Sequence, residues 1–321
     1  MGSLPAVRVT PVRPFLNTGL DYAGPFSVKI SRNKTGKAYL SLFVCLATKA
    51  IHLELVSDLT TTSFLNALKR FIARRGKCSI LYSDNGTTFS GANNHLLELK
   101  EHLLKESTRT QIYEFLLEQF IEWKFIPPYA PHMGGLWESS VKLAKNHMRR
   151  VIGTTILSFE ELYTILTQIE ACLNSRPLTP ITNDPTDLQA LTPGHFLIGE
   201  PLNAIPENNV ASVPTNRLTR YQLLIQIKQR FWTRWSKEYV AQLQQRVKWK
   251  LSSKTRIKEG TMVLLKNENT PPMSWPLGRI ISLHPGADDI TRVVTIRTSR
   301  GIVKRALSKI CILPIEENVQ N

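Results

Sequence analysis

The sequence has few cysteines, no long apolar run and no secretory leader. Its four cysteines are scattered and form no Cys-x-x-Cys pair: Cys45, Cys78, Cys172 and Cys311. They predict reduced, buried thiols of an intracellular protein rather than a disulfide framework or a zinc site. No run of about 18 apolar residues could cross a membrane, and the opening MGSLPAVRVTPVRPF has no signal-peptide core. We therefore expect no membrane partner.

Acidic residues are scarce in the last third of the chain. Residues 1–216 hold 21 Lys and Arg against 18 Asp and Glu (+3), whereas residues 217–321 hold 20 against 7 (+13). A basic block of this kind usually faces a polyanion, and the simpler alternative is a solvated, solubilising surface. At 321 residues, with 42% hydrophobic residues, the chain can form two domains with their own cores.

The first half alternates strand and helix patterns. Strands are expected at 15–30, 37–50 and 51–58, most simply as an antiparallel meander, and again at 78–86 and 121–131. Helices are expected at 58–76, which has a Thr-rich start and Gly76 as its stop, and at 91–106, 133–153 and 158–177. The order βββαβαβαα predicts a mixed α/β fold with a central sheet and flanking helices. We assign residues 16–200 to this core.

The remaining segments differ in composition. Residues 1–15 are Pro-rich and are predicted to form an extended arm, and residues 177–216 are Pro- and Asn-rich, which places a linker at 201–218. A basic helical segment is expected at 219–258. Short apolar runs with Gly and Pro turns at 259–315 predict a small β-barrel.

Three acidic residues at the ends of these elements are the main candidates for chemistry. Asp21 lies in LDYAGPF, Asp84 in LYSDNGTTF, and Glu138 follows two glycines at a helix start, where the helix dipole favours an anion. Alone, each has an ordinary explanation: a strand-end turn, an Asp-Asn-Gly turn, or a surface Glu–Lys pair. If they converge, they can hold two divalent cations that activate a nucleophile and stabilise the leaving oxygen of a phosphodiester.

Basic residues near these acids and in the C-terminal third are candidates for DNA contacts. Lys142 and Lys145 share the helical face of Glu138. In the C-terminal third, four basic residues alternate with Trp232, Trp235 and Trp249: they are Arg230, Arg234, Lys248 and Lys250. Basic and aromatic residues in alternation can stack bases, although tryptophans at helical spacing more often belong to a core.

Other polar residues are weaker candidates. Glu54 lies on an alternating strand, Asp58 is explained by helix capping, and His132 is most simply a turn residue. The remaining histidines show no ligand spacing with any cysteine, so no zinc is expected in this chain.

Several phrases together resemble the integrase region of an LTR retrotransposon or retroviral polyprotein, most closely the Bel/Pao class. They are DYAGPF, FVCLATKAIHLELVSDLT, RFIARRG, YSDNGTTF, PPYAPHMGGLWE, IEACLNSRPL and LTPGHFLIG. The resemblance implies a ribonuclease H-like core, followed by a basic helical segment and a small SH3-like β-barrel. It also implies that Asp21, Asp84 and Glu138 bind two Mg²⁺ or Mn²⁺ ions and that Lys142, Lys145 and Arg149 contact DNA.

By this resemblance, the implied activity is DNA integration: trimming the 3′ ends of an element and joining them to target DNA. The implied partners are terminal-repeat DNA, target DNA and further copies of the chain, in the nucleus after a cytoplasmic stage. The alternatives are a non-catalytic or domesticated DNA-binding and tethering protein derived from an integrase, and a metal nuclease that cleaves without joining.

Two features depart from the retroviral pattern. Between Asp84 and Glu138 lie 138 − 84 − 1 = 53 residues, a longer spacing that we interpret as added helix. The zinc module that normally precedes the core is missing, so a polyprotein fragment, a truncated copy or a domesticated derivative is expected.

Overall fold

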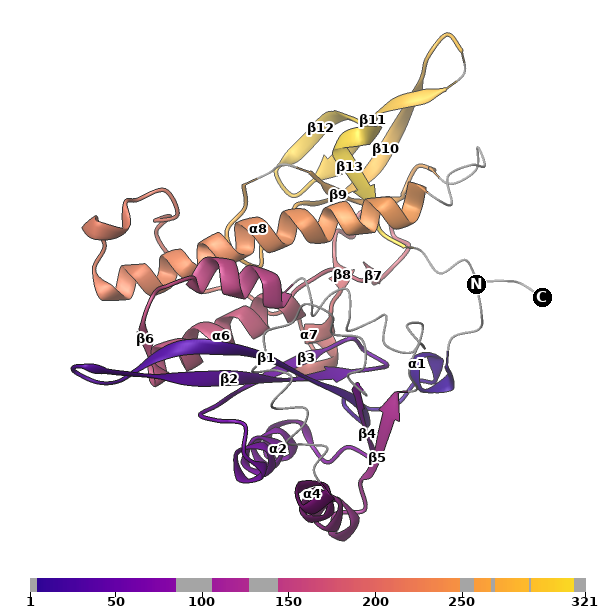
Figure 1. Cartoon of the computed structure of the whole chain (residues 1–321). Helices are drawn as coiled ribbons and strands as arrows, with labels where there is room; N and C mark the ends of the chain where they lie inside the picture. The colour runs from indigo at the N-terminus through magenta and orange to yellow at the C-terminus, as the bar shows by residue number, and fades with distance from the viewer. Residues whose placement is uncertain are drawn as a thin grey trace. The chain divides into compact units, whose positions relative to one another are not determined.

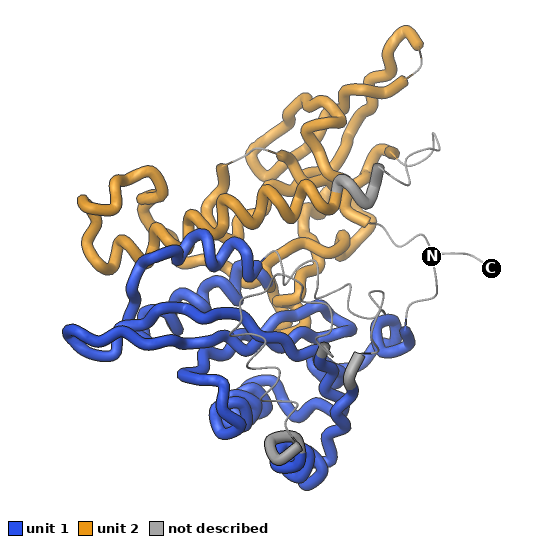
Figure 2. Tube along the Cα trace, viewed as in Figure 1, with its two compact units in different colours: residues 1–173 blue, residues 174–321 orange. Residues whose placement is uncertain are grey.

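The computed structural model describes residues 5–84, 106–126, 144–248, 257–266, 269–288 and 290–314. They fall into two compact units, Met1–Leu173 and Asn174–Asn321, coloured separately in Figure 2. None of the helices in these ranges is long and apolar enough to span a membrane. The four cysteines are free and buried, which confirms the prediction of unpaired thiols.

A mixed sheet forms the centre of the first unit. Its strands are β1 (Asn17–Ser31), β2 (Lys34–Cys45), β3 (Ile51–Val56), β4 (Ile80–Asp84) and β5 (Glu122–Ile126), in the order β3-β2-β1-β4-β5 (Figure 1). β1, β2 and β3 are antiparallel, whereas β4 is parallel to β1 and β5 to β4. The predicted meander and the mixed sheet with flanking helices are confirmed.

Local sequence explains the strand connections and the first long helix. The two-residue turn 32–33 closes the β1–β2 hairpin at the pair Ser31↔Lys34. Helix α2 (Thr61–Arg75) begins where the Thr60 side chain accepts the Ser63 N–H at 3.2 Å, and it ends at Gly76 with a φ of 84°. Asp58 accepts the Thr60 N–H at 3.0 Å, so it braces this N-terminus, as its helix-capping explanation requires.

Helices cover both faces of this sheet. α2 and α4 (Glu106–Glu118) lie on one face, and α6 (Phe159–Asn174) lies on the other (Figure 1). Beneath α2, the rings of Phe43 and Phe71 stack with centroids 4.2 Å apart, and Phe15 meets Phe71 edge-on at 5.3 Å. A further helical stretch spans 144–152, and the short strand β6 (Leu157–Ser158) pairs with β1.

The N-terminal arm differs from the prediction. Residues 1–15 were expected to be extended, but Ala6–Val9 form one helical turn, α1. Pro5 stands at the N-cap with a φ of −54°, and a proline there fits the start of a helix because no backbone N–H is lost from it. Pro11 follows shortly after the turn, where a helix cannot readily continue.

The second unit contains a five-stranded antiparallel sheet and a long helix. The strands are β9 (Met262–Leu265), β10 (Leu277–Pro285), β11 (Thr291–Thr298), β12 (Gly301–Ala306) and β13 (Ile310–Ile312), in the order β12-β11-β10-β9-β13. The SH3-like barrel remains a prediction, because the described ladders leave β12 and β13 at the two ends of the sheet. η2 (Leu307–Lys309) joins these two strands.

Helix α8 (Arg220–Lys248) packs on this sheet. Its Val240 joins Met262 and Leu264 in one apolar cluster, while Val263 and Leu265, which alternate with them on β9, join Val294 and Ile296 in another. Both faces of β9 are therefore buried. Between residue 201 and α8, the only described element is the short η1 (Thr215–Arg217).

Residues 174–200 belong to the second unit, although the catalytic core was expected to extend over 16–200. They carry β7 (Thr179–Pro180), β8 (Ala190–Leu191) and α7 (Pro193–Ile198). Arg279 donates to the carbonyls of Thr182 and Asp187, both at 2.6 Å, and Tyr239 Oη donates to Pro177 O at 2.7 Å. These long-range bonds hold the segment in the second unit. Because its sequence has no clear periodicity, the unit to which it belongs could not be predicted from the sequence.

Candidate active site

The pairing of β1 with β4 brings two of the predicted acids together. The two strands run parallel in the register Thr18↔Leu81, Gly19↔Tyr82 and Leu20↔Ser83. One further step along this register puts Asp84, the last residue of β4, abreast of Asp21. Neighbouring strands lie about 4.8 Å apart. Two acids that are distant in sequence therefore stand side by side in the sheet.

The Asp21 carboxylate is held at both of its oxygens. Oδ1 accepts the backbone N–H of Tyr22 at 2.7 Å, and Oδ2 forms an ion pair with the Lys145 ammonium. The Asp21 side chain is 28% exposed and that of Lys145 is 16% exposed. The carboxylate is thus oriented and partly shielded from water, yet still reachable from solvent.

The helical stretch 144–152 carries Lys145 to this position. Ala144, Met148 and Ile152 form its buried stripe, at the spacing of one helix face. Arg149, one turn after Lys145, donates to Gly24 O at 2.8 Å. Two predicted DNA contacts, Lys145 and Arg149, therefore bind β1 in this structure.

The rest of the predicted catalytic site lies outside the described residues. Glu138, Lys142 and His132 fall between 127 and 143, and the Asp84 side chain is likewise not described. Within the described ranges, no three His, Cys, Asp or Glu side chains form a group that could hold a metal ion. The predicted triad is therefore represented by Asp21 and by the backbone position of Asp84.

The predicted basic residues of the C-terminal third are only partly visible. Arg230 and Arg234 are exposed on α8, and Arg230 Nε donates to Ala211 O at 3.3 Å. Lys248 ends α8, but its side chain is not described, and Lys250 and Trp249 lie outside the described residues.

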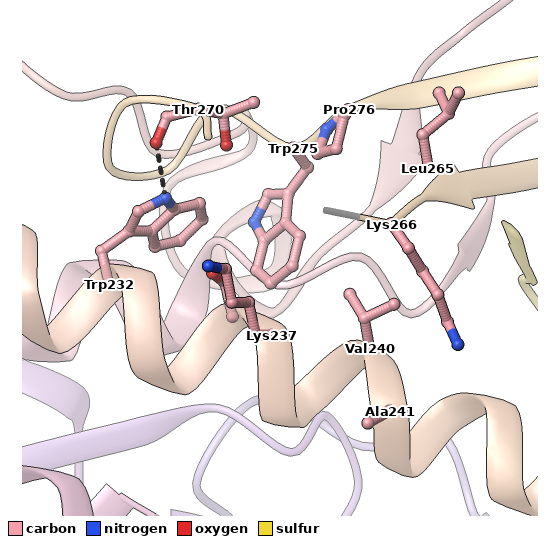
Figure 3. Close-up of a pocket in the computed structure, with 10 residues that line it drawn as sticks. Trp232, Lys237, Val240, Ala241, Leu265, Lys266, Thr270, Trp275 and Pro276 are labelled. Atoms are coloured by element: carbon pink, nitrogen blue, oxygen red, sulfur yellow. Dashed lines mark hydrogen bonds between the residues drawn. The ribbon is translucent and has the colours of Figure 1, made fainter. Parts of the chain in front are cut away.

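Two of the tryptophans considered for base stacking belong to the core. Trp232 is 2% exposed and Trp235 is 1% exposed, so neither can present a ring face to a base. Trp275 meets Trp232 edge-on with centroids 4.8 Å apart, and Trp232 Nε1 donates to Thr270 O at 2.9 Å (Figure 3). The stacking interpretation is wrong for these two residues, and the helical-spacing alternative is correct.

Figure 3 shows the pocket beside this cluster. Trp275 projects into it from the loop before β10, and Lys237 and Val240 line it from α8. Its volume is about 140 Å³, below the 300–1,000 Å³ of typical small-molecule sites. It is therefore a poor candidate for a cofactor site.

A buried charge network at β3 was not predicted from the sequence. Glu54 is fully buried; its oxygens accept from Arg70 Nε at 2.6 Å and Arg74 Nη1 at 2.9 Å, and Oε1 lies 2.9 Å from His52 Nε2. Glu170 of α6 accepts the Leu53 N–H at 2.8 Å and ion-pairs with Arg75. The arginines of α2 and Glu170 of α6 are thereby bonded to β3, the edge strand of the sheet.

This network shifts the ionisation of its members. Burial lowers the pKa of His52, but hydrogen bonds to Glu170 and Glu54 outweigh it, so the net pKa is raised. Burial raises the pKa of Glu54, but hydrogen bonds from His52 and Arg70 outweigh it, so the net pKa is lowered. The signal in the sequence was the pair His52 and Glu54 on one face of an otherwise apolar strand, next to the basic end of α2.

Comparisons with known proteins give one partial match to a family model. The model described as a family of unknown function (DUF5641) matches residues 219–313, which run from the start of α8 to just beyond β13. Among curated proteins, none matches the chain. The matched span is less than half of the chain and says nothing of residues 1–218.

Solved structures that resemble the chain include a retroviral intasome and a retroviral integrase catalytic core domain. A chain of the simian T-cell lymphotropic virus intasome in complex with PP2A regulatory subunit B56 gamma has 12% identity and a TM-score of 0.40, covering 99% of this chain and 85% of that one. The HTLV-2 integrase catalytic core domain in complex with magnesium has 16% identity and a TM-score of 0.32 in its dimeric form, covering 51% and 88%. Its trimeric form has 15% identity and a TM-score of 0.35, covering 58% and 98%. TM-scores below 0.5 do not establish a common fold.

Proposed function

We propose that the chain carries the catalytic core and C-terminal domain of an integrase of the retroviral and LTR-retrotransposon type, closest to the Bel/Pao class. It would act as a divalent-metal-dependent polynucleotidyl transferase with a ribonuclease H-like core. The observation that carries this proposal is the β1–β4 register, which sets Asp84 abreast of Asp21. The phrases DYAGPF, YSDNGTTF and PPYAPHMGGLWE support it from the sequence.

The chemistry of the available ligands fits a divalent cation. Asp21 offers carboxylate oxygens that are fixed by the Tyr22 N–H and are partly open to solvent, and Mg²⁺ and Mn²⁺ prefer such oxygen ligands. Asp21, Asp84 and Glu138 would hold two of these ions. When bound, such ions activate the attacking oxygen and stabilise the leaving oxygen of a phosphodiester.

The protein's own residues would position the DNA. The three carboxylates would fix the reacting phosphate through their ions, and Lys142, Lys145 and Arg149 would neutralise nearby phosphates. Arg230, Arg234, Lys248 and Lys250 would hold DNA through its backbone without reading sequence. No Ser, Cys or Tyr nucleophile is required, because the attacking groups are water and a 3′-hydroxyl.

The proposed partners are terminal-repeat DNA of the element, target DNA and further copies of the chain. Joining two DNA ends requires more than one active site, so we propose a homo-oligomer. The substrate implies a nuclear place of action after a cytoplasmic stage.

One observation favours the alternative of a non-catalytic DNA-binding or tethering protein derived from an integrase. Asp21, the first carboxylate of the proposed site, is already neutralised by Lys145. In that alternative the ion pair is permanent, and the chain binds DNA without cutting it.

A strand-transfer assay tests the proposal. The chain is incubated with Mg²⁺ and labelled duplexes ending in the element's terminal repeats, and the products are separated by size. Joined products are expected for the wild-type chain, and Asp21→Asn or Glu138→Gln should lower their yield by at least about 10³-fold, because a metal ligand is lost.

Asp58→Asn is the matched control, because Asp58 braces the N-terminus of α2 and has no place in the proposed site. It should keep the joining activity. Cleavage without joining would indicate a nuclease, a mobility shift without products would indicate the tethering protein, and normal joining by Asp21→Asn would overturn the assignment.

A further inference from the structure

The carboxylate at the centre of the proposed site already has a cation beside it. Lys145 Nζ forms an ion pair with Asp21 Oδ2, while Oδ1 is engaged by the Tyr22 N–H. The two charged side chains are only 16% and 28% exposed, so each replaces much of the other's hydration. A cation that bound the Asp21 carboxylate would therefore meet the charge of Lys145 beside it.

Lys145 is brought there by a packed helix rather than by a free side chain. The buried residues Ala144, Met148 and Ile152 fix the stretch 144–152, and Arg149 ties it to β1 through Gly24 O. Arg149 carries the same charge one turn away, but it binds a neutral carbonyl. Lys145 and Arg149 thus come from the same helical stretch and both bind β1. They differ in that Lys145 binds a carboxylate and Arg149 binds a backbone carbonyl.

We propose that Lys145 is a positioning residue, the resident counter-ion of Asp21, which a divalent cation must displace in order to bind this carboxylate. This inference rests on the proposed function, because it takes Asp21 to be a metal ligand. Before the metal arrives, the ammonium neutralises and orients the carboxylate. A doubly charged ion at Asp21 repels the ammonium, so metal loading moves Lys145 away from the carboxylate.

An order of events follows from this displacement. Lys145 cannot bind an anionic ligand while its ammonium neutralises Asp21. It can do so once a metal ion has displaced it from the carboxylate. Metal binding should therefore precede and strengthen the binding of a DNA phosphate at Lys145. The ion pair also keeps the carboxylate from remaining uncompensated in the metal-free chain.

The test measures metal binding and lysine exposure instead of catalysis. Mn²⁺ is titrated into the full chain and the free ion is counted by electron paramagnetic resonance, for the wild type, Lys145→Gln, Arg149→Gln and Asp21→Asn. Lys145→Gln should bind Mn²⁺ about tenfold more tightly, equivalent to about 1.4 kcal/mol. Arg149→Gln, which removes the same charge one turn away, should change the affinity by less than about threefold.

A second measurement follows Lys145 in the unaltered protein. Labelling by an amine-reactive reagent, quantified on the Lys145 peptide by mass spectrometry, should rise when Mn²⁺ is added. In Asp21→Asn the labelling should be high from the start and should not respond to the metal.

The outcomes separate this inference from the proposed function. If Asp21→Asn binds Mn²⁺ as the wild type does, the ion is not at Asp21 and both fail. If Asp21→Asn loses the site while Lys145→Gln and Arg149→Gln show equal affinities, or while labelling of Lys145 ignores the metal, only the counter-ion role fails.

Discussion

At the scale of single residues, Gly24 fixes the shape of β1 just beyond Asp21. Its φ of 131° lies where L-residues rarely go, and an added Cβ would stand 3.1 Å from the Tyr39 ring and 3.2 Å from Ala38 O. The β1–β2 register shifts between Ala23 and Phe26, around this glycine. The same residue offers its carbonyl to Arg149, so backbone shape and helix position are linked here.

Gly24→Ala is expected to destabilise the first unit by about 1–3 kcal/mol, because it combines an unfavourable φ with a close approach to Tyr39. The measurement is the free energy of unfolding from denaturant titration. Gly153→Ala is the control: its φ of 53° is also positive, but its Cβ would only meet Arg150 O at an ordinary 3.7 Å. Equal losses for both variants would contradict the packing argument.

At the scale of elements, charged side chains close the open edge of the sheet at β3. The Leu53 N–H is bound by Glu170 of α6, and Leu55 O accepts from Arg70 of α2 at 3.1 Å. An uncovered edge would present these groups to another strand. The network of His52, Glu54 and Glu170 therefore holds two helices to β3 and blocks pairing at that edge.

This network predicts how stability changes with pH. The pKa of His52 is raised above 6.5, so its stabilising effect is complete below that value and is lost as the pH rises through the folded pKa. The pKa of Glu54 is lowered from 4.5, so its effect is present above that value and is lost as the pH falls. Both effects are present together between these two ordinary values.

His52→Gln tests the prediction, because glutamine can keep a hydrogen bond but does not titrate. The free energy of unfolding of the wild type should fall, relative to that of the variant, as the pH rises above 6.5 and through the raised pKa of His52. Taking the difference removes the pH dependence of all other groups. Parallel curves for the two proteins would show that folding does not shift the pKa of His52 and would contradict the prediction.

At the scale of the whole molecule, the charge is concentrated in one stretch of sequence. Residues 217–321 carry +13 of the total +16, and they include the exposed Arg230 and Arg234 of α8. With Trp232 and Trp235 buried, these charges rather than stacking would supply nucleic-acid binding by α8. Such binding releases counterions and weakens with salt.

DNA affinity should therefore fall steeply between about 50 and 200 mM salt. Replacing Arg230 and Arg234 together by Gln should reduce the slope of log K against log salt by about 2, since each phosphate that an arginine neutralises adds about 0.9 to it. The measurement is fluorescence anisotropy of a labelled duplex. A flat salt profile for the wild type would argue against a phosphate-dominated surface.

Arg292→Gln is the control for this experiment. Arg292 is also exposed, but Asp288 neutralises it at 2.6 Å, so its replacement should leave the slope nearly unchanged. A slope change as large as that of the α8 variant would show that any surface charge has the same effect.

Local sequence was enough to predict β1 to β5, α2 and α6 in the first unit, but not α1 (Ala6–Val9) or α4 (Glu106–Glu118), which follows the helix expected at 91–106. The strand meander follows from apolar runs and a short turn, and α2 follows from Thr60 at its start and Gly76 at its end. These signals involve neighbours within a few residues, so they can be recognised without the fold. Residues 174–200 lack such periodicity, and only bonds such as Arg279 to Thr182 O reveal the unit to which they belong.

Sequence patterns alone were sufficient to put Asp84 at the end of a strand and to show that the C-terminal third is basic, whereas Asp21, expected at a strand end, lies inside β1. Three features became visible only in the fold: β1 and β4 pair in parallel with Asp21 and Asp84 abreast, Lys145 neutralises Asp21, and Trp232 and Trp235 are buried. The reason is physical: strand register, ion pairs and burial join residues far apart along the chain. The free energy of these interactions depends on which surfaces pack together, and a local sequence pattern does not contain this information.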